Sequence, residues 1–548
     1  MLLFTWVFEL TPDGLKRDNE VNRTGPASPQ TGKKLDRWVI VMLVVALTYF
    51  AFDKFVLDPA RDAQIAETSV QKGRSEALLE SYGEKSIAVL PFQDMSQDKD
   101  QEYLSDGIAE ELLNLLARVP ELRVISRSSA FSYKGKDIKL TQLARELNVA
   151  HILEGSVRKA GNQVRITVQL VEARSDTNLW SQTYDRNLSD IFVIQDEIAA
   201  AVVDALKVTL LGAMPEQRET DPEVYALYLQ GRYFANIKSE ENFEKALKVL
   251  YQAVAIDPDY APAWVTTSYV YTELLKYGFL PAEQGFTLAM AATEKALEID
   301  PNLAGAWANM AYLKRGRQDW AGAKVAFNKA LRLKPNNSMV IGLAATLAGT
   351  FGQLDKSIEL FEQNVRLNPL GLGSIRALAI RYVCAGRDDE AFEMLNRILV
   401  IHPEFPWIHH ISAEAYLLKG DAETALIESN KESPNRNSAF LKARIFSTLG
   451  REAEAQALIR QLLEGPAELA PHPMARTYAW RGENDLAFEW LEKTNLQSNP
   501  DYTLFLIEPW FRNLVNDPRY ALFLEKIGLL EAWKVMPPEY GGPAKAAN

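Results

Sequence analysis

The sequence predicts a multidomain chain that combines one transmembrane helix, a small α/β domain and an all-α array of helical repeats. Three observations carry this prediction: an uncharged apolar run, a series of short apolar strands between helices, and prolines that recur every 34 residues. We assign an N-terminal tail to residues 1–37, a membrane helix to 38–57, a linker to 58–84, the α/β domain to 85–211, the repeat array with a C-terminal cap to 222–530, and a disordered tail to 531–548.

The composition removes several classes of function. The chain has 548 residues, with 60 Lys+Arg against 72 Asp+Glu and a formal net charge of −12. This acidic balance argues against a nucleic-acid partner, because such proteins present basic surfaces to phosphates. The single cysteine, Cys384, excludes a disulfide framework and a Cys-rich zinc site, and the five histidines lack metal-ligand spacing. No hydrolase motif is present either. We therefore expect no enzyme activity, no catalytic residue, no metal and no cofactor.

The apolar run WVIVMLVVALTYFAF at residues 38–52 contains no charge. Extended to Leu57 it has the length to cross a hydrocarbon core of about 30 Å. A buried core helix is the alternative, but residues 11–37 are a polar stretch and not an adjoining soluble domain. Lys33, Lys34 and Arg37 precede the run, so the positive-inside rule predicts a cytoplasmic tail and places everything after Leu57 outside the cytoplasm.

The next segment predicts a small α/β domain. Residues 86–92 (SIAVLPF) and 122–126 have the length and composition of buried strands, and a hairpin signal at Gly161 separates two alternating runs. Ser105 or Asp106 is expected to cap the first helix. The sequence Arg127-Ser128-Ser129 is interpreted as a turn, with an anion nest as the less favoured alternative. We expect strands at 86–92, 122–126, 152–159, 164–171 and 178–184, and helices at 103–118, 140–147 and 191–211.

This domain resembles the TolB-type amino-terminal domain, also described as FlgO-like. The resemblance is carried by SIAVLPF, YLSDGIAEEL and LWSQTYDR, and by residues 146–199. It implies an exported, inner-membrane-anchored bacterial protein whose α/β domain is followed by helical repeats. Some relatives carry a class III nucleotide cyclase domain in front, and others, the CadC-like regulators, a winged-helix DNA-binding domain. Residues 1–37 are too few for either domain.

The opening WVFELTPDGLKRD at residues 6–18 resembles a segment that follows an upstream membrane helix in longer relatives. This resemblance implies an N-terminus that is shortened relative to those relatives.

Prolines after helical runs mark the repeats of the C-terminal part, and from the second one onward they are 34 residues apart. Glycines and small residues five positions later mark the turn and the close contact between two antiparallel helices. This pattern resembles the tetratricopeptide repeat, a helix-turn-helix unit. We expect about eight units, with a longer loop near residues 277–285. The markers are Pro258, Pro301, Pro335, Pro369 and Pro403; Gly352, Gly386, Gly420, Gly450 and Gly482; and Ser357, Ala391, Ala425, Ala455 and Ala487.

Stacked repeats of this kind form a concave groove lined by the first helix of each unit. Arg and Trp side chains in such a groove are plausible anchors for a peptide or partner helix. The alternative is that these side chains pack between repeats or solvate the surface. The positions that the resemblance projects into the groove are Tyr312, Arg315, Arg376, Trp407, His410 and Glu414.

Two functions remain open at this point. The favoured hypothesis is a membrane-anchored, non-enzymatic scaffold that binds protein partners through the groove on the periplasmic side. The alternative is a signal-transduction component, a sensor or a partner of a nucleotide cyclase or transcription regulator, that lacks its own output domain.

Overall fold

The computed structural model describes residues 8–11, 14–17, 85–119, 121–136, 138–206, 220–432, 436–464, 471–494 and 504–543. The chain divides into two compact units, residues 1–77 and 78–548, which are described separately. The first unit contains an antiparallel hairpin of β1 (Phe8–Thr11) and β2 (Gly14–Arg17), within the segment assigned to the N-terminal tail.

The predicted membrane helix at 38–57 and the linker at 58–84 lie outside the described residues. Among the helices that the structure does describe, none combines the length and apolar character needed to cross a bilayer.

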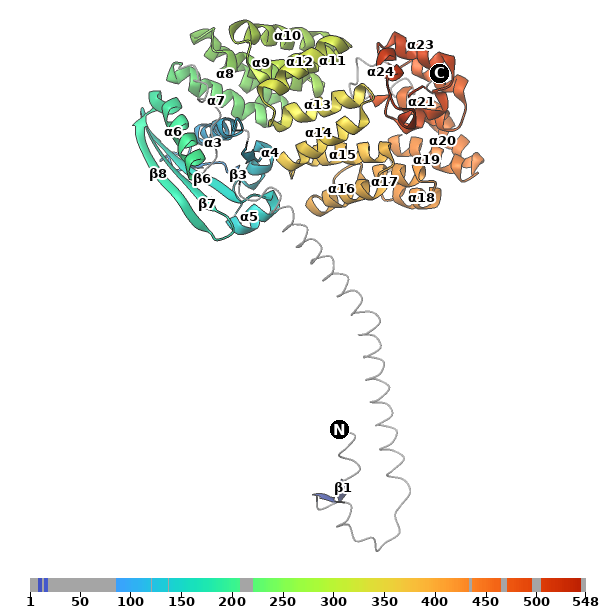
Figure 1. The fold of residues 1–548 in the computed structure, drawn as a ribbon, viewed down its shortest axis with the longest axis horizontal. Coiled ribbons are helices and arrows are strands. Elements are labelled where there is room, and N and C mark those ends of the chain that lie inside the picture. The colour runs from blue at the N-terminus through green and yellow to red at the C-terminus, as the bar shows by residue number, and fades with distance from the viewer. Residues whose placement is uncertain are drawn as a thin grey trace. The chain divides into compact units, whose positions relative to one another are not determined.

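The second unit begins with a six-stranded mixed sheet in the order β5-β3-β6-β7-β8, with β4 paired to β6 (Figure 1). β3 pairs in parallel with β5 and β6, whereas β6, β7 and β8 form an antiparallel meander. The strands are β3 (Ser86–Val89), β4 (Gln93–Asp94), β5 (Arg123–Val124), β6 (His151–Ala160), β7 (Gln163–Glu172) and β8 (Thr177–Asn187). The predicted small α/β domain is therefore confirmed.

Helices cover both faces of this sheet. α3 (Glu102–Leu116) and α6 (Ile191–Ala205) pack with Ile87, Val89 and Leu153 in one apolar cluster. α4 (Arg127–Ala130) and α5 (Leu140–Leu147) pack with Ala88 and Ile152 in a second cluster. Strands buried on both faces explain the unbroken apolar run of β3.

The expected cap of α3 is wrong. The helix begins at Glu102, so Ser105 and Asp106 lie inside it and are buried. The Asp106 carboxylate accepts from Lys134 at 2.6 Å, which is a tertiary contact and not a cap. Helical periodicity alone placed the start one residue late and did not locate the cap.

Eight antiparallel helix pairs follow in the described part of the chain, as the 34-residue period predicts (Figure 1). The pairs are α7 (Pro222–Asn236) with α8 (Glu240–Ile256), α9 (Ala261–Lys276) with α10 (Ala282–Ile299), α11 (Ala304–Gly316) with α12 (Trp320–Leu333), α13 (Ser338–Thr350) with α14 (Leu354–Leu367), α15 (Leu372–Ala385) with α16 (Asp388–Ile401), α17 (Ile408–Leu418) with α18 (Ala422–Ser429), α19 (Arg436–Thr448) with α20 (Glu452–Glu464), and α21 (Pro471–Trp480) with α22 (Asn484–Glu492). This part of the chain is a TPR-like helical array.

The glycines and small residues that mark the array have the backbone conformation and the burial predicted for them. The five turn glycines, from Gly352 to Gly482, all have φ between 70° and 89°, a region that side-chain-bearing residues rarely adopt. The five small residues that follow them, from Ser357 to Ala487, are completely buried between paired helices. In each of these units, the glycine therefore forms the turn and the small residue allows the two helices to approach closely.

The insertion near residues 277–285 does not form a long loop. Only residues 277–281 separate α9 from α10, and most of the additional residues lengthen these two helices. The ring of Phe279 stacks on that of Tyr277 with 6.0 Å between the ring centroids, and both rings pack against Phe243 of α8. These aromatic contacts hold the short connection between α9 and α10 against α8, in place of the predicted longer loop.

The C-terminal cap extends further than predicted. α23 (Pro518–Lys526) is the expected capping helix, and α24 (Leu530–Lys534) and a short 3₁₀ turn (Pro538–Tyr540) follow it. Trp533 and Met536 are buried, so a disordered tail beginning at residue 531 is wrong for the described residues up to 543. The cap also turns back on the array, because Trp320 donates through Nε1 to the Ile527 carbonyl at 2.7 Å.

Candidate functional site

The α/β domain is joined to the first repeat by a close crossing of α3 and α7. Gly107 allows this approach, since a Cβ at that position would lie 2.7 Å from a methyl carbon of Leu229. At one end of the crossing, the Tyr233 hydroxyl donates to Glu102 at 3.0 Å. α6 adds a further contact with α7, because Gln195 Nε2 donates to the Tyr225 hydroxyl at 2.9 Å.

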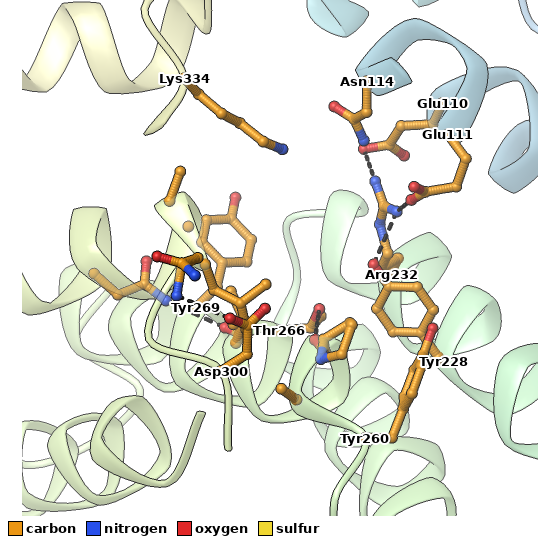
Figure 2. Close-up of a pocket in the computed structure, with 18 of the residues that line it drawn as sticks. Glu110, Glu111, Asn114, Tyr228, Arg232, Tyr260, Thr266, Tyr269, Asp300 and Lys334 are labelled. Atoms are coloured by element: carbon orange, nitrogen blue, oxygen red, sulfur yellow. Dashed lines mark hydrogen bonds and ion pairs between the residues drawn. The ribbon is translucent and has the colours of Figure 1, made fainter. Parts of the chain in front are cut away.

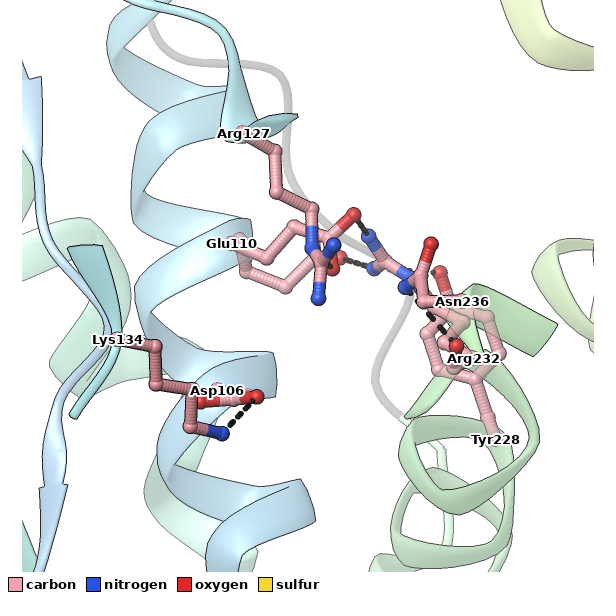
Figure 3. A network of polar contacts seen from close by, with 8 residues as sticks. Asp106, Glu110, Arg127, Lys134, Tyr228, Arg232 and Asn236 are labelled. Carbon is pink, nitrogen blue, oxygen red and sulfur yellow. Dashed lines mark hydrogen bonds and ion pairs between the residues drawn. The ribbon is translucent and has the colours of Figure 1, made fainter. Parts of the chain in front are cut away.

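A half-buried ion-pair network holds this crossing together (Figure 3). Arg232 of α7 pairs with both Glu110 and Glu111 of α3, and Arg127 Nε binds the second oxygen of Glu110 at 2.9 Å. Arg232 also donates to the Tyr228 hydroxyl at 3.0 Å. Burial alone would raise the pKa of Glu110, but the positive charges of Arg232 and Arg127 lower it, so the carboxylate stays ionised.

A second joint connects the α/β domain to the turn between α14 and α15. The hydroxyls of Ser128 and Ser129 donate to the Asn368 side-chain oxygen at 3.0 and 2.6 Å. The Ser126 amide donates to the Leu367 carbonyl at 2.7 Å, and the Leu370 amide donates to the Ser129 hydroxyl at 3.0 Å. Arg127-Ser128-Ser129, predicted as a turn, instead begins the short helix α4 and makes an interdomain contact that its sequence does not indicate.

A cavity of about 1370 Å³ lies beside the first joint, and Glu110, Glu111 and Arg232 border it (Figure 2). Its walls come from α3 on one side and from α7, α9, α11 and the end of α12 on the other. Apolar side chains and charged groups of both signs make up most of the lining, and tyrosines and asparagines make up most of the rest. Among the lining residues are Glu110, Glu111, Asn114, Arg118, Tyr228, Arg232, Tyr260, Tyr269, Asp300, Asn302, Asn309 and Lys334.

Lys334 reaches into this cavity from the C-terminal end of α12, toward α3 (Figure 2). Burial lowers its pKa to about 8, and the positive charges of Arg118 and Arg232 act in the same direction, against the carboxylates of Glu111 and Glu110. The side chain is thus held as a cation in an environment that disfavours the charge.

The six residues projected into the groove do not form one site. Tyr312 and Arg315 lie together on α11, with the guanidinium 5.2 Å from the ring centroid, but Arg315 is only 6 % exposed. Arg376 lies on α15 and is partly exposed. Arg315 therefore belongs to the packing of the array, whereas Arg376 is accessible to a partner.

The other three projected residues meet at α17. Trp407 precedes the helix with a φ of 75°, and its ring lies 5.6 Å from that of His410. His410 Nε2 lies 3.6 Å from Glu414 Oε1, and the same oxygen binds Arg444 and Arg476 at 3.0 Å each. Glu414 therefore links α17 to α19 and α21 inside the array, and a structural role accounts for its charge.

The residues that build the cavity could not be recognised from the sequence. Arg232 and Lys334 lie on helices whose spacing marks them only as array members, and nothing in the sequence connects them to Glu110. Cys384 is buried in the array, and burial raises the pKa of its thiol to about 12. Within the described residues, no group of three or more His, Cys, Asp or Glu side chains is arranged to hold a metal ion.

Residues 83–201 match the family model described as HilA/YgeH-like transcriptional regulator, second domain. A protein of Rhizobium meliloti (strain 1021) described as "Putative adenylate cyclase 3" is 41% identical over 189 residues, which cover 34% of this chain and 32% of that protein. The chain thus spans about a third of this relative's length. These matches confirm a small α/β domain shared with transcription regulators and with part of an adenylate cyclase; the finer TolB-type assignment stays a prediction.

Two solved structures resemble the array. A tetratricopeptide repeat protein from Parabacteroides merdae is 15% identical, covers 50% of this chain and 99% of its own, and has a TM-score of 0.34. PilW, a type IV pilus biogenesis factor, is 22% identical, covers 36% of this chain and 93% of its own, and has a TM-score of 0.32. These TM-scores are low, so the description of the array as TPR-like is based on its own 34-residue period and its helix pairs.

Replacing Arg232 with methionine tests the α3–α7 joint. This change leaves Glu111 without its ion-pair partner and Glu110 with Arg127 alone, and we expect a loss of about 3–5 kcal/mol in the free energy of unfolding. Urea denaturation measures it. Arg165→Met is the matched control, because the Arg165–Asp185 pair is exposed on the β7–β8 hairpin, and its removal should leave the midpoint nearly unchanged. Equal effects of the two changes would contradict the role of Arg232.

Replacing Lys334 with methionine tests the environment of the cavity. The folded-state pKa of about 8 lies below the ordinary 10.5, so the unfolded chain binds the proton more tightly and the charged lysine destabilises the fold below pH 8. We expect a gain of about 1–2 kcal/mol at pH 7, less than the whole shift is worth because the side chain is partly exposed.

The gain at Lys334 should shrink as the pH rises from 8 to 10.5, because the wild-type lysine then loses its proton. Urea denaturation at pH 7 and pH 10 measures it. Lys248→Met, at an exposed position of α8, is the control and should change stability at neither pH. A loss of stability in Lys334→Met at pH 7 would contradict the assigned environment.

Proposed function

We propose that the chain is a signal-transduction component that binds a protein partner through its helical array. One observation carries this proposal: an α/β domain of a type shared with a transcription regulator and an adenylate cyclase is fixed to the array at two joints. A change in either part that alters these joints also changes the other part, which is what a signalling module requires.

Partner binding is assigned to the accessible part of the predicted groove. Arg376 lies on the first helix of its repeat and makes no hydrogen bond or ion pair with any described residue. Trp407, partly exposed at the start of the first helix of the next repeat, supplies an aromatic surface. Arginine and tryptophan are the residue types that contribute most to binding at protein interfaces. Arg315 and Glu414 are left out of the contact surface because they are engaged inside the array.

The proposal keeps the predicted membrane location. Residues 38–57 would anchor the chain in a bacterial inner membrane, with the α/β domain and the array on the periplasmic side. The chain would then pass its signal on by recruiting another protein, such as a nucleotide cyclase or a transcription regulator with a periplasmic region. A scaffold without a role in signalling is the other form of this proposal, and the shared α/β domain favours signalling.

The partner and the location can be tested in one experiment. A membrane-impermeant crosslinker is applied to spheroplasts that carry the full-length chain, and crosslinked proteins are recovered and identified. We expect a signalling protein among them, at least about fivefold depleted with Arg376→Ala and unchanged with the control Lys248→Ala. Crosslinks that form only after the spheroplasts are lysed would contradict the periplasmic location. Equal recovery with Arg376→Ala would contradict the proposed contact surface.

A further inference from the structure

The first helices of the last five repeats are covered by a later part of the same chain. Residues 504–514 lie against α13, α15, α17, α19 and α21, which are helices of the kind predicted to line the groove. At one end, a Cβ on Gly349 of α13 would lie 3.2 Å from Ile507 Cδ1. At the other end, Asn513 Nδ2 donates to the Ala479 carbonyl of α21 at 3.0 Å. This part of the predicted groove is therefore already occupied.

The middle of the segment places a tryptophan among three of these helices. Trp510 lies in a 3₁₀ turn (Pro509–Leu514) and is buried. It packs in one apolar cluster with Leu417 of α17 and Ile445 of α19, and its ring centroid lies 5.5 Å from that of Trp480 on α21. A buried aromatic side chain in a pocket between helices is a typical anchor of a bound peptide.

The contacts of the segment with the array are made through side chains. Among the described residues, no backbone-to-backbone hydrogen bond joins residues 504–514 to the array. The segment reaches two carbonyls of the array with side chains instead, Asn513 at α21 and Arg512 Nη2, which donates to the Cys384 carbonyl of α15 at 3.3 Å. The segment thus lies on the array as a separate peptide would, and its hold depends on a small number of side chains.

Two buried arginines of the array face this segment. Arg444 of α19 and Arg476 of α21 share Oε1 of Glu414, at 3.0 Å each. Their guanidinium carbons lie 4.2 and 5.1 Å from the ring centroid of Trp510. Arg476 Nε also lies 3.7 Å from Glu508 Oε2. The array therefore contacts a carboxylate and an aromatic ring that are two positions apart in the segment.

The segment does not satisfy these arginines fully. Within the described residues, Nε and Nη1 of Arg444 and Nε of Arg476 are buried and make no hydrogen bond. Burying a charged donor without an acceptor is costly, and an occupant that supplies the acceptor recovers this cost. A partner segment whose carboxylate reaches these N–H groups therefore gains an interaction that residues 504–514 do not make.

We propose that residues 504–514 close the groove of the last five repeats as an internal ligand, and that a partner segment with a carboxylate two positions before an aromatic side chain replaces it. The inference goes beyond the contact surface proposed at Arg376 and Trp407, because it concerns the covered part of the groove and the chemistry of its ligand. Such a partner binds there only when residues 504–514 have left, so the segment is an autoinhibitory contact.

The test measures binding of a fluorescein-labelled peptide with the sequence of residues 504–514 to the full-length chain in detergent, by fluorescence anisotropy. Two variants of the chain open the groove. Trp510→Ala removes the aromatic anchor, and the milder Arg512→Ala/Asn513→Ala removes the two side-chain hydrogen bonds. We expect both to bind the peptide at least about tenfold more tightly than the wild-type chain, because the internal segment competes less. Leu522→Ala, at an exposed position of α23, is the control and should bind like the wild type.

Changes in the peptide test the chemistry of the site. Glu508→Gln or Trp510→Ala in the peptide should weaken its binding to the opened variants at least about tenfold. Circular dichroism confirms that each variant of the chain is folded, and the double variant decides the test if Trp510→Ala does not fold.

Three results would overturn the proposal. The first is equal binding of the peptide by the wild-type chain and the folded opened variants, or no binding by any of them. The second is binding that ignores both changes in the peptide. The third is dimer formation by the opened variants in light scattering without peptide binding, which would assign the groove to the same segment of a second copy. None of these results depends on the crosslinking of a protein partner.

Discussion

The half-buried ion pairs between Arg232 and the two glutamates of α3 are the interaction on which the arrangement of the second unit depends. They join the α/β domain to the first repeat at a point where Gly107 lets the helices approach closely. Removing one member of such a pair leaves an unpaired charge that is costly to bury. The loss of a single side chain is therefore expected to destabilise the whole joint. The contacts of Ser128 and Ser129 with Asn368 fix a second point, and the cavity borders the first joint.

The repeated part of the fold could be predicted because its physics is local. A glycine with positive φ and a small residue five positions later specify the turn and the close contact of one hairpin, so Gly386 and Ala391 define their unit without reference to other repeats. The strands of the α/β domain were equally accessible through apolar runs and the Gly161 turn. The prediction of a disordered tail from residue 531 was wrong because a Pro- and Gly-rich composition does not reveal that Trp533 is buried.

The candidate site could not be predicted, because its residues are joined only in the folded chain. Glu110 and Arg232 are more than a hundred positions apart, and Lys334 comes from a third segment. The groove projection also treated the array as an isolated solenoid. It therefore placed Arg315 and Glu414 on an open surface, whereas packing and ion pairs engage them within the array. Side-chain periodicity gives the face of a helix, but it does not say what covers that face.

The α/β domain is docked on the array, and disulfide trapping can test this arrangement. Ser128 and Asn368 are both replaced by cysteine in the full-length chain, and native Cys384 is buried. The docked arrangement predicts rapid, intramolecular disulfide formation under mild oxidation. A control pair, Ser128→Cys with Asn337→Cys, puts the second thiol at a different inter-repeat turn and should not react. Absence of the 128–368 disulfide, or equal rates for both pairs, would contradict the docked arrangement.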